Sequence, residues 1–144
     1  MKPTLLFLLL AALGNCCYHI GQKSLHAAGG NPMLLLAACY AFALTLSLAA
    51  APFFGTVRFS DGLVPALSDP RVWLVSLGTV MIELGFLMAY RSGGSAQWSG
   101  VAVNGAAALL LTPAGLLLFK EAFSWQKLAG IALTLAGIWL LAKD

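Results

Sequence analysis

Long apolar runs separated by short polar segments dominate the pattern of residues along this chain. The runs cover residues 3–22, 32–54, 72–90, 95–119 and 125–142. A helix needs roughly 17 to 25 apolar residues to cross a hydrocarbon core of about 30 Å, and each run has such a length. The runs are rich in Leu and Ala and lack the alternation typical of barrel strands. The pattern therefore predicts an all-α integral membrane protein, a bundle of about five transmembrane helices forming one domain, residues 1–144.

Turn-forming residues separate the first runs. The segment HAAGGNP, with Gly29, Gly30 and Pro32, ends the first run, and GTVRFSDGLVPALSDP follows the second. Pro113 lies inside the fourth run, where a packed membrane helix tolerates proline with a kink and without ending. The first run has a second interpretation, because Lys2 followed by LLFLLLAAL also resembles a secretory signal, and its removal would leave four spans.

The composition supports the membrane assignment, and the charges bear on the orientation and on the kind of partner. Hydrophobic residues make up 60% of the chain and charged residues 9%, and the mean hydropathy is +0.90, far outside the usage of soluble domains. With five spans, five Lys and Arg residues fall on the side of the N-terminus and three on the other side. This bias favours a cytoplasmic N-terminus and would also permit insertion in both orientations. The net charge of +3 comes without a basic cluster, so we expect no nucleic-acid partner.

Signatures of metal, cofactor and enzyme sites are absent from the sequence. Cys16, Cys17 and Cys39 have neither metal-ligand spacing nor C-x-x-C spacing. The chain contains no H-E-x-x-H motif, no serine elbow and no acidic metal pair. We therefore expect no metal, no cofactor and no enzymatic activity.

One carboxylate, Glu83, lies inside an apolar run, in the stretch TVMIELGFLMAY at residues 79–90. Ionisable groups are costly in lipid and usually face a bundle interior or an aqueous cavity. A desolvated carboxylate can alternate between protonated and charged states or pair with a cationic substrate. Alternatively, Glu83 is a structural residue that accepts a hydrogen bond from Tyr90, His19 or another helix.

Polar residues recur at helical spacing in three of the runs. The first run carries Asn15, Tyr18, His19 and Gln22, the third Ser76, Thr79, Glu83 and Tyr90, and the fourth Gln97, Asn104 and Thr112. Within each run these positions share one face of a helix. We expect the three polar stripes to line a central cavity, with the second run outside it.

Two interpretations stay open for most of these polar residues. His19 is a packing residue or a proton relay, and Asn15 and Asn104 are interhelical hydrogen-bonding groups or ligand-binding groups. Tyr90 and Trp98 form an aromatic wall for a cation or anchor the interface. The predicted substrate-binding or coupling residues are Glu83, His19, Asn15, Tyr18, Tyr90, Trp98 and Asn104.

Small residues mark one face of the last run. Gly130, Thr134 and Gly137 recur at offsets of four and seven residues. Small residues allow membrane helices to approach each other closely. This seam suits packing within the chain or pairing with a second copy.

The last two runs carry a resemblance to a known family. The stretch LLLTPAGLLLFKEAFSWQKLAGIALTLAGIWLLAK, with Pro113, Glu121, Gly130 and Gly137, resembles the closing signature of the EamA-like repeat in the drug/metabolite transporter superfamily. LGNCCYHIGQKSL is similar to the first span of that repeat, and LGFLMAYRSGGSAQWSGV to the region joining its third and fourth spans. AQWSGV also resembles the small multidrug resistance proteins, which are related four-span transporters.

The resemblance implies a transporter in the plasma membrane, which is the inner membrane of a bacterium. It would export or flip a small metabolite, a hydrophobic cation or a lipid-linked sugar by alternating access, with proton coupling through Glu83. The small multidrug resistance proteins carry their coupling carboxylate in the first span, where this chain has Asn15. A single repeat implies a homodimer, antiparallel or parallel, or pairing with a homologous subunit. The alternative function is a non-transporting accessory subunit of a membrane complex.

Overall fold

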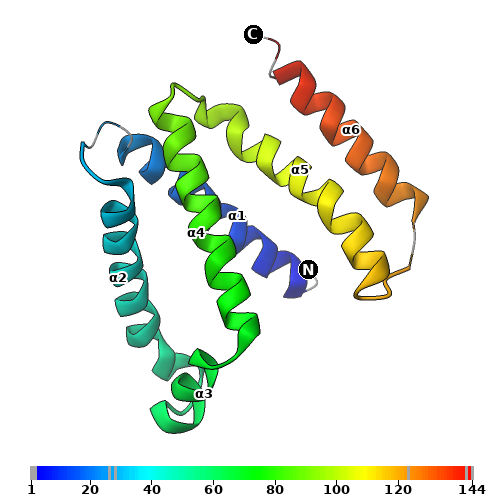
Figure 1. Ribbon diagram of the computed structural model, residues 1–144. Helices are drawn as coiled ribbons and strands as arrows, with labels where there is room; N and C mark the ends of the chain where they lie inside the picture. Colours follow the sequence, from blue (N-terminus) through cyan, green and yellow to red (C-terminus); the bar gives the residue numbers. More distant parts are fainter. Residues whose placement is uncertain (1–2, 26, 28, 123, 142, 144) are drawn as a thin grey trace. The chain divides into compact units, whose positions relative to one another are not determined.

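The computed structural model describes residues 3–25, 27, 29–122, 124–141 and 143. Within these residues the chain forms helices and turns and contains no strand (Figure 1). The α-helices are α1 (Pro3–Leu25), α2 (Pro32–Ala50), α3 (Val64–Leu67), α4 (Pro70–Arg91), α5 (Ala96–Leu117) and α6 (Trp125–Leu141). A 3₁₀ turn, Ala51–Phe54, and a π-helical turn, Phe59–Leu63, lie between α2 and α3. The all-α prediction is confirmed.

Within the part of the chain that the structure describes, four helical stretches are long and apolar enough to cross a membrane. They are Thr4–Leu25, Pro32–Phe54, Pro70–Arg91 and Ala96–Leu117. Each matches a predicted run to within a few residues, and α5 continues past Pro113 to Leu117. Helix α6 has 17 residues, which gives it a length of about 26 Å. Its use as a fifth span stays a prediction, and residue 142, where that span was predicted to end, lies outside the described residues.

Side-chain caps explain where three of the helices begin. The Asn31 side chain accepts a hydrogen bond from the Met33 backbone N–H at 2.8 Å, and Asp69 accepts one from Arg71 N–H at 2.8 Å. Ser95 accepts from the Gln97 N–H at 3.2 Å. Each cap satisfies a backbone donor that the first helical turn leaves free. These polar residues therefore fix the ends of α2, α4 and α5.

The helices group into two compact units. Residues 1–23 and 93–144 contribute α1, α5 and α6 to the first unit, and residues 24–92 contribute α2, α3 and α4 to the second. The second unit holds the buried apolar side chains, Leu36, Phe86, Leu87 and Tyr90.

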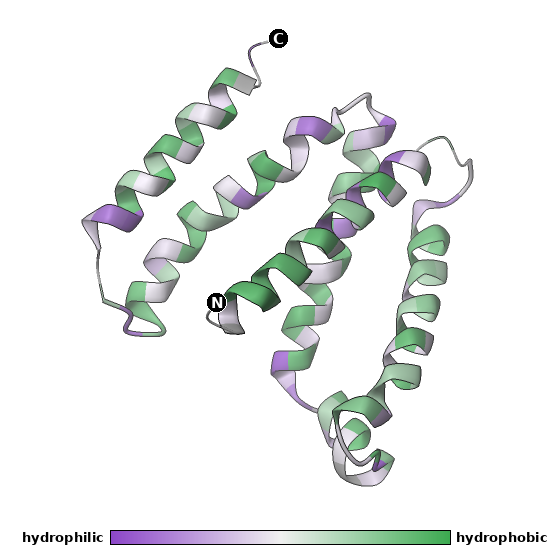
Figure 2. Cartoon of the chain, turned by 180° about the vertical axis from the view of Figure 1, so that it is seen from behind, coloured by the Kyte–Doolittle hydropathy of each residue, from purple (hydrophilic) through white to green (hydrophobic). Residues whose placement is uncertain are grey.

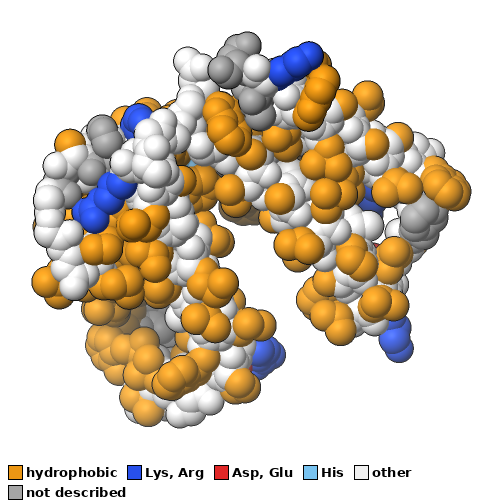
Figure 3. Space-filling view, turned by 45° about the horizontal axis from the view of Figure 1, so that its top comes forward, with side chains coloured by type: hydrophobic (Ala, Val, Ile, Leu, Met, Phe, Trp, Pro, Cys, Tyr) orange, Lys and Arg blue, Asp and Glu red, His pale blue; other side chains and the backbone are white. Residues whose placement is uncertain are grey.

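Most apolar side chains lie on the outside of the helices. Leu10 is 67% exposed, Phe42 74% and Leu133 75%. Figure 2 shows hydrophobic residues along most of each helix, with hydrophilic residues gathered near the turns. Figure 3 shows apolar side chains over the visible face, with Lys and Arg at a few places. Such a surface is costly in water and suits a hydrocarbon environment.

Candidate functional site

Helices α2 and α4 pack tightly over part of their length and enclose a groove beside it. Leu36 of α2 and Leu87 and Tyr90 of α4 are buried to 1% exposure or less. The groove has a volume of about 270 Å³. Its walls are Tyr40 of α2 and four residues of α4, namely Val75, Ser76, Thr79 and Val80. The groove thus belongs to a single unit of the structure.

Glu83 lies one helical turn beyond Thr79 on α4, and its side chain is half-buried. The Tyr40 hydroxyl interacts with the Glu83 carboxylate across the contact between the two helices. The two groups are close without a direct hydrogen bond, because the buried Tyr40 oxygen has no partner in hydrogen-bonding geometry. The Glu83 carboxylate is therefore not held by α2.

The two hydroxyl groups on the α4 side of the groove have their protons engaged. Ser76 Oγ donates to the Val72 carbonyl oxygen at 2.8 Å, and Thr79 Oγ1 donates to the Val75 carbonyl oxygen at 2.9 Å. Each hydroxyl oxygen keeps lone pairs that can accept a further hydrogen bond. Together with the Glu83 carboxylate, they make the α4 side of the site a row of acceptors.

The sequence expectation placed the second span outside a central cavity lined by the first, third and fourth spans. Tyr40 of α2 lines a groove with α4, and the place of α2 relative to that central cavity stays a prediction. Tyr40 was not among the predicted site residues, because α2 offers only Ser47 as a polar neighbour at helical spacing. The hydroxyl of Tyr40 was the available signal, since a buried tyrosine needs a hydrogen-bond partner for its hydroxyl group.

A second polar cluster lies where α1 meets α5. Rings of Tyr18 and His19 meet edge to face, with centroids 5.2 Å apart. A Cβ atom on Gly100 would come within 2.5 Å of His19 Nε2, so the imidazole fits only because residue 100 is glycine. Lys23 Nζ donates to the Gly94 carbonyl oxygen at 2.8 Å. These polar groups thus serve the packing of two helices.

Asn104 lies in a groove between α5 and α6 of about 260 Å³, beside Gly105 and Thr134. The Thr134 hydroxyl donates to the Gly130 carbonyl oxygen at 2.9 Å. Thr134 and Ile138 pack against Gly105, whereas added Cβ atoms on Gly130 and Gly137 would meet nothing within 4 Å. The predicted seam of small residues is therefore divided between packing on α5 and an open face.

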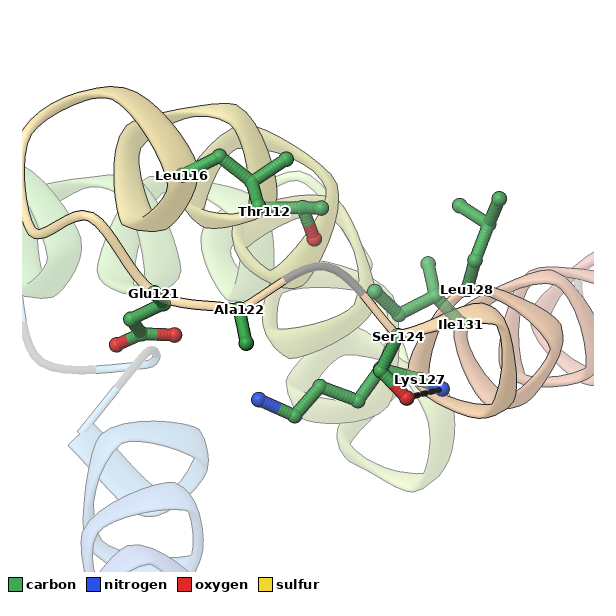
Figure 4. A pocket seen from close by; sticks show the side chains of 8 residues that line it. All are labelled: Thr112, Leu116, Glu121, Ala122, Ser124, Lys127, Leu128 and Ile131. Atoms are coloured by element: carbon green, nitrogen blue, oxygen red, sulfur yellow. Dashed lines mark hydrogen bonds between the residues drawn. The ribbon is translucent and has the colours of Figure 1, made fainter.

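A small pocket of about 80 Å³ lies at the turn between α5 and α6 (Figure 4). Glu121 and Lys127 contribute opposite charges to its lining. The turn itself is held by the Glu121 backbone N–H, which donates to the Gly115 carbonyl oxygen at 3.0 Å, while Lys120 adopts a φ of 52°. The Glu121 carboxylate also lies against Gly115. We attribute this pocket to the geometry of the turn.

The remaining predicted site residues have varied surroundings. Tyr90 is fully buried and stacks on Phe86 with ring centroids 6.0 Å apart, Asn15 is exposed on α1, and Trp98 is half-buried near the start of α5. Glu83 and Tyr90 belong to the second unit, and the other five belong to the first. A single cavity containing all seven stays a prediction.

Among the described residues, no group of three or more His, Cys, Asp or Glu side chains could hold a metal ion. No family model matches the sequence, and comparisons with curated proteins and with solved structures also find no match. The geometry of the α2–α4 groove is thus the basis for a functional proposal.

Proposed function

We propose that this chain is a transmembrane transporter of the drug/metabolite type that binds its cargo in the α2–α4 groove. The observation that carries this proposal is a carboxylate, Glu83, beside a groove that is lined in part by hydroxyl groups and lies between two helices that could cross a membrane. A polar group at such a depth is expensive, and its position is typical of substrate or ion pathways. The cargo is exported or flipped across the plasma membrane, the inner membrane of a bacterium.

The chemistry of the groove favours a cargo that donates hydrogen bonds. Ser76 and Thr79 offer only acceptor lone pairs, because their protons are bound to backbone carbonyl groups. The carboxylate of Glu83 adds charge to the same row, and the ring of Tyr40 offers a π face. An ammonium group can donate hydrogen bonds to the hydroxyl acceptors, pair with the carboxylate charge and lie against the tyrosine ring. An amine-bearing metabolite, a hydrophobic cation or an amine-bearing lipid-linked sugar therefore fits better than an anion.

Proton coupling follows from competition for the carboxylate. When Glu83 carries a proton it loses its charge attraction for an ammonium group, and when it loses the proton it can pair with one. Proton and cargo then bind in turn. Alternating access is commonly built from two repeats, so a second copy, antiparallel or parallel, or a homologous subunit would complete the transporter.

The test uses the purified protein in liposomes of defined internal pH. A panel of amines, small metabolites and lipid-linked sugars is added, and proton movement is recorded for the wild type, Glu83→Gln and Glu121→Gln. Glutamine keeps the size of the side chain and removes its titration. Glu121 is the matched control because it is an exposed acid at the α5–α6 turn, outside the groove.

We expect at least one amine to move protons with the wild type and with Glu121→Gln, and none to do so with Glu83→Gln. An unchanged signal in Glu83→Gln would show that Glu83 is not the coupling group. A panel without any signal would count against transport of these classes.

A second candidate function, a non-transporting accessory subunit, is favoured by the open face of α6. Gly130 and Gly137 lie seven residues apart, and nothing lies within 4 Å of a Cβ atom added to either. Glycines on an open membrane face are typical of close helix pairing. If Gly137→Leu dissociates a complex and abolishes its function while Glu83→Gln leaves that function intact, the accessory role replaces transport.

A further inference from the structure

The connection between α2 and α4 is helical and strongly apolar on its outside. It starts with the 3₁₀ turn Ala51–Phe54 and continues, after Gly55, through the π-helical turn Phe59–Leu63 directly into α3 (Val64–Leu67). We name residues 51–69 the connecting segment. Its most exposed large apolar side chains are Phe54 at 90%, Phe53 at 87%, Val64 at 59%, Leu67 at 59% and Phe59 at 56%.

Apolar side chains form a stripe along the helical part of the connecting segment. Phe59, Leu63 and Leu67 recur every four residues, which places them along one side of a helix. The positions between them hold the apolar Val64, Pro65 and Ala66 as well as Ser60 and Gly62. A short helix with an exposed apolar stripe can lie in the plane of a membrane interface, with that stripe toward the acyl chains.

The backbone of the connecting segment satisfies many of its own hydrogen bonds. The Gly62 N–H donates to the Arg58 carbonyl oxygen at 3.0 Å, and the Ser68 N–H to the Pro65 carbonyl oxygen at 3.1 Å. Trp73 Nε1 of α4 donates to the Leu67 carbonyl oxygen at 2.7 Å. A loop in water can leave such groups to the solvent, whereas a segment close to hydrocarbon must satisfy them internally.

Charge does not explain a membrane contact here. Residues 51–71 contain two basic residues, Arg58 and Arg71, and two acidic residues, Asp61 and Asp69, so their sum is zero. Arg71 is paired with Asp69 at 2.6 Å. Attraction to anionic lipid headgroups is therefore weak, and burial of apolar side chains is the available driving force.

We propose that the connecting segment lies flat in the phospholipid interface and anchors the depth of the α2–α4 unit in the bilayer. Residues 51–54 end the membrane-crossing stretch Pro32–Phe54, and the rest of the segment joins this stretch to Pro70–Arg91, so its apolar surface is continuous with theirs. Phe53 and Phe54 enter the region between headgroups and acyl chains, and Trp73, 69% exposed, lies at the same end of α4. The proposal is independent of the transport function.

The test measures the depth of a nitroxide label by electron paramagnetic resonance. The full chain carries serine in place of Cys16, Cys17 and Cys39, and a single label is attached after Phe54→Cys, Leu63→Cys or Ser92→Cys. The Ser92 label is the control, because Ser92 is an exposed residue in the polar turn after α4. Collisions with oxygen, which concentrates in lipid, and with a water-soluble nickel chelate are recorded in vesicles of phosphatidylcholine, with and without phosphatidylglycerol.

We expect labels at positions 54 and 63 to collide with oxygen several-fold more, and with nickel several-fold less, than the label at position 92. The result should be equal in both kinds of vesicle, because the charges of residues 51–71 sum to zero. Nickel accessibility at position 63 equal to that of the control would place the segment in water and overturn the proposal. Protection from both reagents would indicate a covering protein, and a depth found only with phosphatidylglycerol would indicate a charge-driven contact; either result also overturns it.

Discussion

Two pairs of helices in this protein bury polar side chains in different ways. In the α1–α5 pair, the His19 ring lies against the backbone of Gly100, and the Lys23 ammonium group is bound to the Gly94 carbonyl oxygen. In the α2–α4 pair, Tyr40 and Thr79 line a groove next to Glu83. Glycine thus lets a polar ring of one helix reach the backbone of the other in the first pair, whereas the second pair leaves space beside its polar groups.

The difference shows that a polar residue inside a membrane helix does not identify a binding site by itself. Both pairs satisfy the general expectation that such residues face other protein groups. Of the two pairs, only α2–α4 combines an acidic side chain with hydroxyl acceptors that line an open groove. Mutations in the α1–α5 pair should therefore change the stability of the protein, and mutations in the α2–α4 pair should change its function.

The largest effect on stability is expected for Gly100→Ala. The new methyl group would collide with His19 Nε2, and the imidazole would have to move away from α5. Overpacking of this kind costs about 1 to 3 kcal/mol, so the midpoint of thermal unfolding in detergent should fall. Gly78→Ala in α4 is the control, because nothing lies within 4 Å of the added atom. Equal stability of both variants would mean that the α1–α5 contact is not closely packed.

A smaller effect, on function, is expected for Tyr40→Phe. The change removes the hydroxyl that interacts with Glu83 and keeps the ring. Hydrogen bonds to charged groups contribute about 1.5 to 3 kcal/mol. No direct hydrogen bond joins Tyr40 to Glu83, so the loss should be smaller, and the apparent affinity for an amine cargo should fall by roughly three- to tenfold. Tyr18→Phe in α1 is the matched control and should leave the affinity unchanged. An equal loss in both variants would remove the functional distinction between the two pairs.

Thr79→Val should weaken cargo binding less than Tyr40→Phe does. Valine has nearly the same shape as threonine but cannot accept a hydrogen bond. Loss of one neutral acceptor corresponds to about 0.5 to 1.5 kcal/mol, which is roughly a two- to tenfold weaker affinity. Thr45→Val is the control, since Thr45 also donates to a backbone carbonyl oxygen of its own helix, at 2.8 Å, and does not line the groove. Binding titrations in detergent would compare the two, and an unaffected Thr79→Val would exclude that hydroxyl from the site.

The sequence predicted the helices better than it predicted their partners. Apolar length and the turn residues around Gly30 and Pro32 gave most span ends within three residues, because burial in lipid depends on local composition. Which helices pack together depends on the shapes of the side chains at their contact. Tyr40 was missed since two polar residues seven positions apart, Tyr40 and Ser47, give only a weak periodic signal. The role of Gly100 depends on a ring 81 residues earlier in the chain.

The helical nature of the connecting segment was also not predicted from the sequence. GTVRFSDGLVPALSDP was interpreted as a loop, because Gly55, Gly62 and Pro65 are typical of turns. Proline is acceptable in the first turn of a helix, and Pro65 occupies that place in α3. The Gly and Pro residues thus favoured a loop, whereas the segment contains helical turns and exposes Phe and Leu side chains.

The smallest effect is expected for Asp69→Asn, at the start of α4 and outside the groove. Asparagine still caps the helix, but it loses the charge pair with Arg71. The Arg71 guanidinium lowers the pKa of the Asp69 carboxyl from its ordinary value. The stability from this pair is therefore present above the ordinary pKa of aspartate and is lost as the pH falls through the lowered value. Thermal unfolding from pH 7 downward should show a slightly lower midpoint for the variant, with the difference vanishing in acid and cargo affinity unchanged at pH 7. A change in cargo affinity would extend the functional region from the groove to the end of α4, and the contrast between the two helix pairs would then no longer depend on Glu83 and its neighbours alone.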